Sequence, residues 1–352
     1  MRIPGKTSLL TVCMIIPLAL AGCGIHNNSS SSSKEQSMAD KVSLKQLAEH
    51  KDNKKKPDEK TAARQLYLVD ANGHVTPQVF NLPQSNEVAK QALSYLIQDG
   101  PVSDILPDGF QAVIPAGTTF SLNLDKEGTL HADFSKEFED YKAADEQKIM
   151  QSITWTLTQF DNIKRVKLSV NGKSLQQMPV AKTPIPTQGL TRADGINVEK
   201  NYAGDITNSS SMIVYYTAKS STGSTYYVPV TERYDNSEDK YTALIDALKN
   251  TPIGDNTLQA PFNSDVSLTD KPVINDKGVA TLNFNDYLYA DSSKKVVSDE
   301  ALNCLALTFT NQPAITKVAI EVQGKTQVVT ESGKPLTQPV GVPNVNVNKT
   351  GV

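Results

Sequence analysis

The chain has 352 residues, of which 38% are hydrophobic, and a formal net charge of −3. At roughly 100 to 200 residues per domain, this length and apolar content are sufficient for two hydrophobic cores. The slight excess of acidic over basic residues provides no electrostatic basis for binding nucleic acid, so a nucleic-acid partner is not expected.

The first 22 residues have the pattern of a signal peptide. Two basic residues precede an apolar run, Leu9 to Leu20, of about 12 residues, which is too short to cross a bilayer as a helix. The pair Ala21-Gly22 before Cys23 completes a lipobox, which needs small residues beside the thiol that receives the lipid. We therefore predict that Cys23 is lipidated and is the mature N-terminus. Two acyl chains at this residue are sufficient to anchor the protein stably in a membrane. The alternative is an ordinary secretory peptide with a chance cysteine.

Residues 23–63 have the composition of a tether. The serine run from Ser29 to Ser33 is followed by a stretch rich in lysine and acid, with few apolar residues. Such a sequence cannot bury enough apolar surface to offset the entropy of ordering, so we expect disorder. The run Lys54-Lys55-Lys56 is interpreted as part of a solvated linker, with contact to anionic headgroups as the alternative.

A first folded unit is predicted for residues 64–188. Its expected elements are strands at 65–69 and 79–82, a helix that begins near 87 and ends before 101, strands at 118–124 and 129–134, a helix around Ile153, and a strand around Leu168. The last strand ends at Asn171-Gly172, a pair that favours a type I′ hairpin turn.

The stretch from Gln151 to Lys173 returns, with an offset of 152, as Asn303 to Lys325. The unchanged positions are Thr156, Thr158, Ile163, Val166, Val170, Gly172 and Lys173, which recur as Thr308, Thr310, Ile315, Val318, Val322, Gly324 and Lys325. A second unit with the same order of elements is therefore predicted for residues 211–338. Its expected elements are strands at 212–216 and 226–230, a helix before Pro252, strands at 266–269 and 279–284, a helix and a final strand.

The predicted fold class is α+β, with two tandem β-β-α-β-β-α-β repeats. Each repeat is expected to be a small sheet with two helices packed on it. Residues 189–210 are predicted to link the repeats, and residues 339–352 form a tail to which we assign no structure.

Few side chains in the predicted units suit catalysis. His26 and His50 lie in the tether, while His74 and His131 fall in a turn and on a strand without metal-ligand spacing. The sequence has no G-x-S-x-G, P-loop or G-x-G-x-x-G motif. We therefore predict no catalytic, cofactor-binding or metal-binding residues, and Cys23 is the one functional position assigned.

Acidic residues raise the alternative of a glycosidase, which works with two carboxylates. The first unit has an acidic cluster where a strand leaves for a helix: Asp133, Glu137, Glu139 and Asp140. In the second unit, Asn283 replaces Asp133 and the cluster thins to Asp286 and Asp291. A solvated loop explains this pattern more simply than an active site.

The remaining candidates have structural interpretations. Cys304 lies among apolar residues of a predicted helix, and an apolar site raises a thiol pKa, so we favour a small core residue over a nucleophile. Because Cys13 lies in the signal peptide and Cys23 carries lipid, no intramolecular disulfide is expected. Several aromatic residues offer a sugar-binding platform as an alternative but are interpreted as strand and core residues: Trp155, Tyr215, Tyr216, Tyr226 and Tyr227.

The lipobox, the tandem units and their endings VKLSVNGK and VAIEVQGK resemble the GerM-type sporulation and germination lipoproteins of endospore-forming Bacillus relatives, which have two GerMN domains. The resemblance covers residues 64–338 and the lipid signal. It implies a fold similar to the ring-building modules of secretion machines. It also implies a non-enzymatic role in the assembly between mother-cell and forespore membranes, with effects on germination. Among individual residues, only Cys23 carries over.

The hypothesis that we favour is a membrane-tethered scaffold whose partners are other proteins of the sporulation assembly and, through Cys23, the membrane. A duplicated module leaves edge strands and an open helical face for docking. No cofactor, nucleic acid or small-molecule substrate is expected. The alternative is a peptidoglycan-binding or cell-wall-modifying lipoprotein. A solute-binding protein of a transporter would need larger lobes than these repeats provide.

Overall fold

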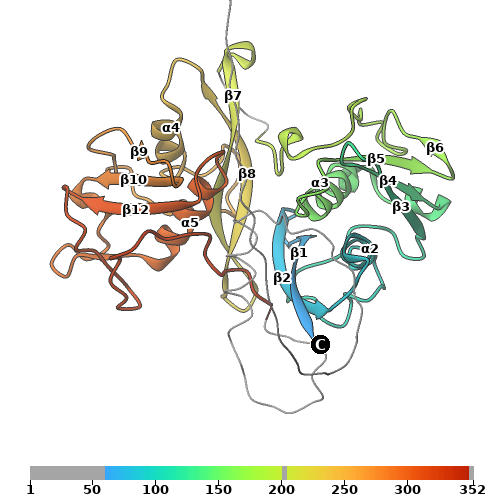
Figure 1. Ribbon diagram of the computed structural model, residues 1–352, viewed down its shortest axis with the longest axis horizontal. Coiled ribbons are helices and arrows are strands. Elements are labelled where there is room, and N and C mark those ends of the chain that lie inside the picture. The colour runs from blue at the N-terminus through green and yellow to red at the C-terminus, as the bar shows by residue number, and fades with distance from the viewer. Residues whose placement is uncertain (1–59, 200–203, 349–352) are drawn as a thin grey trace, which may run out of the picture. The chain divides into compact units, whose positions relative to one another are not determined.

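The computed structural model describes residues 60–199 and 204–348 (Figure 1). The predicted signal peptide, Cys23 and nearly all of the predicted tether lie outside the described residues, as do the last four residues of the tail. Over the described ranges, no helix combines the length and the apolar character required to span a membrane. All described residues belong to one compact unit.

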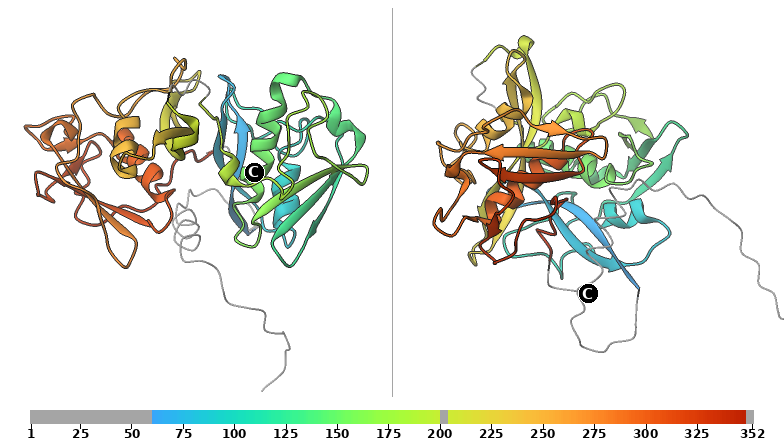
Figure 2. Two further views of the ribbon diagram at one scale, coloured as in Figure 1. Left: turned by 90° about the horizontal axis from the view of Figure 1, so that it is seen from above. Right: turned by 60° about the vertical axis from the view of Figure 1, so that its left-hand side comes forward.

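The first repeat contains a β-hairpin and a separate four-stranded sheet (Figures 1 and 2). Its elements are β1 (Thr61–Val69), β2 (Val75–Pro83), α2 (Val88–Ser94), β3 (Phe120–Leu124), β4 (Thr129–Phe134), the 3₁₀ turns η1 (Lys136–Glu139) and η2 (Ala143–Asp145), α3 (Glu146–Leu157), β5 (Arg165–Val170) and β6 (Lys173–Ser174). The sheet order is β3-β4-β5-β6, and β4 pairs with β5 in parallel. A parallel pair needs a crossover, which α3 supplies.

The second repeat has the same main order of hairpin, helix, two strands, helix and strand, and adds a short strand before its last helix. Its elements are η4 (Ile206–Asn208), β7 (Ser209–Lys219), β8 (Thr225–Asp235), α4 (Lys240–Ala247), β9 (Val273–Ile274), β10 (Val279–Phe284), η5 (Asp286–Leu288), β11 (Val296–Val297), α5 (Asp299–Thr310), β12 (Lys317–Val322) and β13 (Val329–Thr330). Strands β7 and β8 form a hairpin, β12-β10-β9 form a sheet in which β10 and β12 are parallel, and β11 pairs with β13. In both repeats, the hairpin is thus separate from the sheet that holds the parallel pair, and the second repeat has the short β11-β13 pair as a third sheet.

The predicted strand at 266–269 is wrong, because only Leu268 makes a bridge there, to Phe284. Five positions from Leu268 to Val273 span only three positions of β10, from Phe284 to Thr281, so the segment between them bulges. Pro272 lies in this bulge, where its missing N–H breaks no ladder hydrogen bond.

Each main helix is joined to its hairpin by one of the recurring threonines. Thr156 of α3 accepts a hydrogen bond of 2.9 Å from Tyr67 N in β1. Thr308 of α5 accepts one of 3.0 Å from Tyr215 N in β7. All four residues are buried, so each hydroxyl satisfies a strand N–H that would otherwise be unpaired. Threonine therefore recurs at the offset of 152 because each hairpin needs its hydroxyl as a hydrogen-bond acceptor.

The final hairpin turn of each repeat takes the predicted conformation. Asn171 and Gly172 have φ of 49° and 76°, and Gln323 and Gly324 have φ of 52° and 70°. Positive φ at both central residues is the requirement of a type I′ turn. The turn predicted at Asn171-Gly172 is confirmed, and the corresponding turn of the second repeat has the same conformation.

Each repeat has its own hydrophobic core, as its apolar content predicted. On α3 the buried residues Ile149, Ile153 and Leu157 recur at helical spacing and face the first core. The two cores approach each other at Phe110 and Ile213, which are partly buried and pack against both.

The segment between the repeats at residues 189–210, called the connector below, and the tail both contain ordered extended segments. Leu190 in the connector bridges Val166 of β5, and Val340 in the tail bridges Val318 of β12. The connector continues through η3 (Arg192–Asp194) and packs on α3, where Trp155 Nε1 donates to Gly195 O over 3.0 Å. In both repeats, the segment that follows the repeat therefore makes an antiparallel bridge to the last long strand, β5 or β12.

Candidate functional site at the junction of the repeats

The acidic cluster considered as an active site is a solvated loop, as we interpreted it. Asp133 Oδ1 accepts hydrogen bonds from Ser169 Oγ at 2.7 Å and from Gly172 N at 2.9 Å. In the second repeat, Asn283 Oδ1 accepts from Gly324 N at 2.8 Å. An acid and an amide thus hold the same turn. The other members of the cluster are exposed: Glu137, Glu139 and Asp140.

Cys304 and the five candidate aromatic residues are buried, which confirms their interpretation as core residues. Burial raises the pKa of the Cys304 thiol well above its ordinary value, so the thiolate is disfavoured. Tyr226 and Tyr227 are 7% and 6% exposed, too little to present a sugar-binding platform. Among the described residues, no group of three or more His, Cys, Asp or Glu residues is arranged to hold a metal ion.

Polar side chains converge instead where the two hairpins meet. Strands β2 and β8 contact each other but belong to separate two-stranded sheets. Pro77 of β2 and Pro229 of β8 occupy equivalent positions at the offset of 152. Because proline has no N–H, it is tolerated on an edge strand and hinders continuous pairing of the two edges. The gap between the strands is bridged by side chains.

Asn197, in the connector, supplies the first bridge. Its Oδ1 accepts from Val75 N of β2, and its Nδ2 donates to Val75 O and to Pro229 O of β8, each over 2.8 Å. The residue has a φ of 45°, a left-handed conformation that asparagine tolerates better than most residues. One side-chain amide thus satisfies backbone groups of both repeats.

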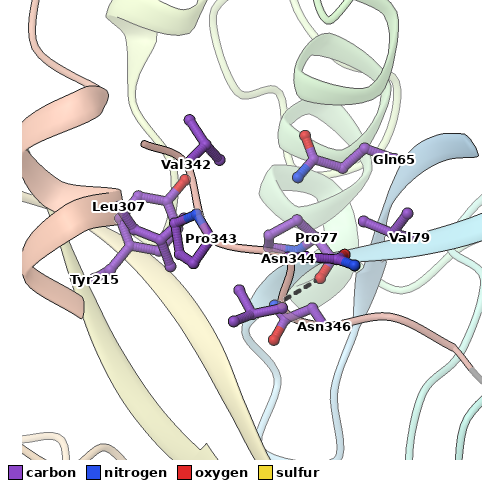
Figure 3. A pocket seen from close by; sticks show the side chains of 10 residues that line it. Gln65, Pro77, Val79, Tyr215, Leu307, Val342, Pro343, Asn344 and Asn346 are labelled. Carbon is purple, nitrogen blue, oxygen red and sulfur yellow. Dashed lines mark hydrogen bonds between the residues drawn. The ribbon is translucent and has the colours of Figure 1, made fainter. Parts of the chain in front are cut away.

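Asn346, in the tail, supplies the second bridge (Figure 3). Its Oδ1 accepts from Tyr227 N of β8, and its Nδ2 donates to Tyr227 O and to Pro77 O of β2, each over 2.8 Å. Its φ is 55°. Tyr227 is equivalent to Val75 at the offset of 152, so the two asparagines make the same three bonds with the repeats exchanged. The junction therefore has an internal two-fold relation, and we call the two bridges the amide clamps.

Backbone hydrogen bonds extend each clamp. In the connector, Ile196 O accepts from Thr231 N of β8 at 2.9 Å, and Glu199 N donates to Thr231 O at 3.0 Å. In the tail, Asn346 O accepts from Val79 N of β2 at 2.9 Å, and Asn348 N donates to Val79 O at 2.9 Å. The segment that follows each repeat is therefore paired with the hairpin of the other repeat.

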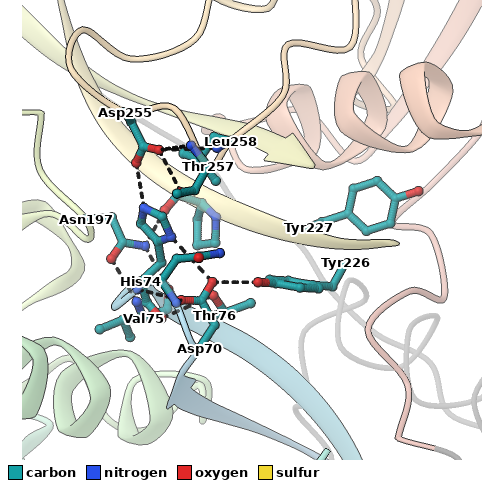
Figure 4. A network of polar contacts seen from close by, with 12 residues as sticks. Asp70, His74, Val75, Thr76, Asn197, Tyr226, Tyr227, Asp255, Thr257 and Leu258 are labelled. Carbon is teal, nitrogen blue, oxygen red and sulfur yellow. Dashed lines mark hydrogen bonds and ion pairs between the residues drawn. The ribbon is translucent and has the colours of Figure 1, made fainter. Parts of the chain in front are cut away.

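A charged network lies beside the clamps (Figure 4). His74 follows the turn between β1 and β2, and its Nε2 lies 2.7 Å from Asp255 Oδ2 of the second repeat. Its Nδ1 lies 3.4 Å from Asp70 Oδ2, an ion-pair distance without hydrogen-bond geometry. Tyr226 O–H, from β8, donates to the same Asp70 oxygen over 2.9 Å. Two polar contacts thus join the repeats at this point.

The electrostatic environment favours a positive imidazole between two negative carboxylates. Burial lowers the pKa of His74, but the negative charges of Asp70 and Asp255 and the hydrogen bond to Asp255 outweigh burial and raise this pKa above its ordinary value. Burial raises the pKa of Asp70, but His74 and the Tyr226 hydroxyl outweigh it and hold this pKa below its ordinary value. The second histidine of the described residues, His131, is exposed on β4 near Asp125.

The hollow at the junction is too small for a substrate. Its volume is about 60 Å³, and it lies between the tail residues 342–346 and side chains that include Pro77, Tyr215 and Leu307 (Figure 3). Sites for small-molecule ligands typically measure roughly 300 to 1,000 Å³. This hollow is therefore smaller than a typical ligand site.

Comparison with known proteins identifies the tandem units. A family model named Germane, described as sporulation and spore germination, matches residues 65–176 and 213–328, once on each repeat. The chain belongs to the Germane family. This Germane chain is 43% identical, over 97% of its length and 97% of the relative's, to the spore germination protein GerM of Bacillus subtilis (strain 168). A solved structure of the tandem GerMN domains of the B. subtilis sporulation protein GerM has a TM-score of 0.74 and 48% identity, over 80% of this chain and 98% of that one.

These matches confirm the predicted family, the α+β fold and the tandem GerMN-like repeats of this Germane chain. The amide clamps were missed, although the sequence contains a signal for them. The connector sequence Ile196-Asn197-Val198 recurs in the tail as Val345-Asn346-Val347, and Thr187-Gln188 recurs as Thr337-Gln338. The repeat thus extends into the segments for which a linker and a tail are predicted.

Proposed function

We propose that the chain is a membrane-anchored lipoprotein that acts as a non-enzymatic assembly component during sporulation, with consequences for germination. Family membership and the similarity to B. subtilis GerM support the role in sporulation and germination. The lipobox at Cys23 supports a lipid anchor on the outward face of the cell membrane. From the GerM-type resemblance we place the chain on the mother-cell or outer forespore membrane, facing the space between the membranes and bound to other proteins of that assembly.

The observation that carries this proposal is the pair of amide clamps. Asn197 and Asn346 each bond to both hairpins, so an assembly partner meets two modules in one fixed arrangement. A preorganised body does not lose the entropy of ordering a flexible linker when it binds.

Strand β3 is the docking edge that we favour for this role. Among the described strands, β3 pairs only with β4, so its outer edge is available for an added strand. Leu124 at its end is 38% exposed. In the second repeat, the corresponding edge is shortened to β9 and interrupted by the bulge at Pro272, features that discourage strand addition.

Anchoring and assembly are tested in sporulating cells with the full chain. A photo-crosslinking residue in place of Leu124 should capture proteins of the sporulation assembly, and the same residue in place of exposed Lys142, outside β3, is the matched control. Cys23→Ala should release the chain from the membrane and abolish the capture. Membrane retention of Cys23→Ala, or hydrolysis of peptidoglycan by the purified chain, would overturn the proposal.

The peptidoglycan-binding alternative has no comparable support, because Tyr226 and Tyr227 are buried. Sedimentation of the purified chain with isolated cell wall distinguishes the two functions. The scaffold proposal predicts that the chain stays in the supernatant.

A further inference from the structure

We propose that His74 is a proton-operated latch between the repeats: its imidazolium form holds the junction closed, and its deprotonation loosens it. This inference goes beyond the proposed function, since it concerns the coupling of the two repeats and holds or fails whatever the chain binds. It rests on the position of the His74 ring, which is 13% exposed and lies between a carboxylate of each repeat (Figure 4).

The hydrogen-bonding capacity of imidazole decides which form fits. A neutral ring has one N–H donor and one lone-pair acceptor, whereas the imidazolium has two donors. At His74 both nitrogens face carboxylate oxygens, Asp255 Oδ2 at 2.7 Å and Asp70 Oδ2 at 3.4 Å. A neutral ring would direct a lone pair at one of these anions. The imidazolium donates to Asp255 and also places positive charge beside Asp70, which a neutral ring does not.

The two carboxylates are held in place, so they cannot turn away when the ring loses its proton. Asp70 Oδ1 accepts from Asn72 N and His74 N, at 2.9 and 2.8 Å, while its Oδ2 accepts from Tyr226. Asp255 Oδ1 accepts from Thr257 N at 2.8 Å and from the Thr257 hydroxyl at 2.7 Å. Deprotonation of His74 therefore leaves two fixed anions without the cation between them.

Other charged groups near the latch do not replace the imidazolium. The Lys148 ammonium approaches the turn at Gly73 but is paired with Asp145 at 3.0 Å. Glu199 accepts from Ile253 N on the loop that leads to Asp255, and it supplies no positive charge. The charge balance at this contact thus depends on protonation of His74.

The direction of the pH effect follows from linkage. The pKa of His74 in the folded chain is raised above its unfolded value, so its contribution is complete below the unfolded pKa of about 6.5 and is lost as pH rises through the folded pKa. Mildly acidic conditions close the junction and alkaline conditions loosen it.

Inter-repeat distances measured at two pH values test the latch. The mature chain from residue 23, with Cys23→Ser, receives spin labels at Lys126→Cys and Lys271→Cys, exposed positions on the first and second repeat. We expect one narrow distance distribution at pH 6 and a broader one at pH 9. His74→Gln should give the broad distribution at both pH values, and the matched control His131→Gln should behave like the parent chain.

A Glu232→Gln background removes another buried group whose pKa lies near neutrality, at about 7. Retention of the pH-dependent broadening in that background supports the latch. Equal distributions at pH 6 and pH 9 in the parent chain, or a narrow distribution at both pH values in His74→Gln, would overturn it. If His74→Gln does not fold, Asp255→Asn removes the charge of the second repeat instead, and it should abolish the difference between the two pH values.

Discussion

Removal of the Asn346 side chain tests whether the amide clamps stabilise the folded chain. The side chain makes three hydrogen bonds of 2.8 Å to backbone groups of β2 and β8. One hydrogen bond contributes a net of roughly 0.5 to 1.5 kcal/mol, and a buried group left without a partner costs about 1 to 3 kcal/mol. Since the site is half-buried and water can replace part of the loss, we expect Asn346→Gly to lower the free energy of unfolding by about 2 to 3 kcal/mol.

Glycine is the informative substitution because Asn346 has a φ of 55°. Glycine adopts this conformation without steric cost, so the change removes the amide without adding backbone strain. Asn346→Ala should lower the free energy of unfolding by roughly 1 kcal/mol more than Asn346→Gly, because a residue with a Cβ atom pays at least this cost in the left-handed conformation. Asn197→Gly is the matched variant, because Asn197 makes the equivalent three bonds at a φ of 45°.

The free energy of unfolding is measured by guanidinium titration, followed by the fluorescence of Trp155, the single tryptophan, which contacts the connector. Hydrogen exchange gives a local readout, because Val79 N donates to Asn346 O, and its amide should lose protection in Asn346→Gly. A loss below about 0.5 kcal/mol in both glycine variants, the usual effect of a surface substitution, would refute the clamp.

Three further predictions concern carboxyl groups. Glu146 accepts hydrogen bonds from three backbone N–H groups and the Tyr141 hydroxyl, so Glu146→Ala should lower the free energy of unfolding by about 2 to 4 kcal/mol in guanidinium titration. Burial raises the pKa of Glu146, but the hydrogen bonds, first those of Thr183, outweigh burial and hold this pKa below its ordinary value. The stability that the Glu146 carboxylate contributes is therefore present above its unfolded pKa and is lost as pH falls through its folded pKa. An acid unfolding curve of the parent chain that matches the curve of Glu146→Gln would contradict this. Asp133→Asn should change the stability by less than about 0.5 kcal/mol, since Asn283 already serves at the equivalent turn, and a larger loss would show that the charge matters. Burial raises the pKa of Glu232 to about 7, so the free energy of unfolding should fall as pH rises from 4.5 through this value. Glu232→Gln should remove this part of the dependence of the free energy of unfolding on pH. The same pH dependence in the parent chain and in Glu232→Gln would disprove the prediction.

Sequence reasoning located the features that local physics specifies. The Asn171-Gly172 turn follows from the need for positive φ, and the two helices follow from apolar spacing that puts Ile153 and Leu157 on one buried face. The offset of 152 exposed the duplication. It also marked Thr156 and Thr308, although only the structure shows that each hydroxyl satisfies a strand N–H.

The bulge at Pro272 marks the limit of that reasoning, because the apolar pattern at 266–269 predicts a strand and gives no account of the register with β10. Register depends on which residues of a distant strand lie opposite.

By itself, the sequence determined two α+β units, their turns and their cores, because hydrophobic period and turn chemistry act over a few neighbouring residues. Tertiary structure alone decided how the connector and tail are used. Asn197 bonds to Val75 across 122 positions, and Asn346 bonds to Pro77 across 269. No local propensity encodes such pairs, since an asparagine in an extended segment has the same backbone preferences whether its amide meets water or two strands.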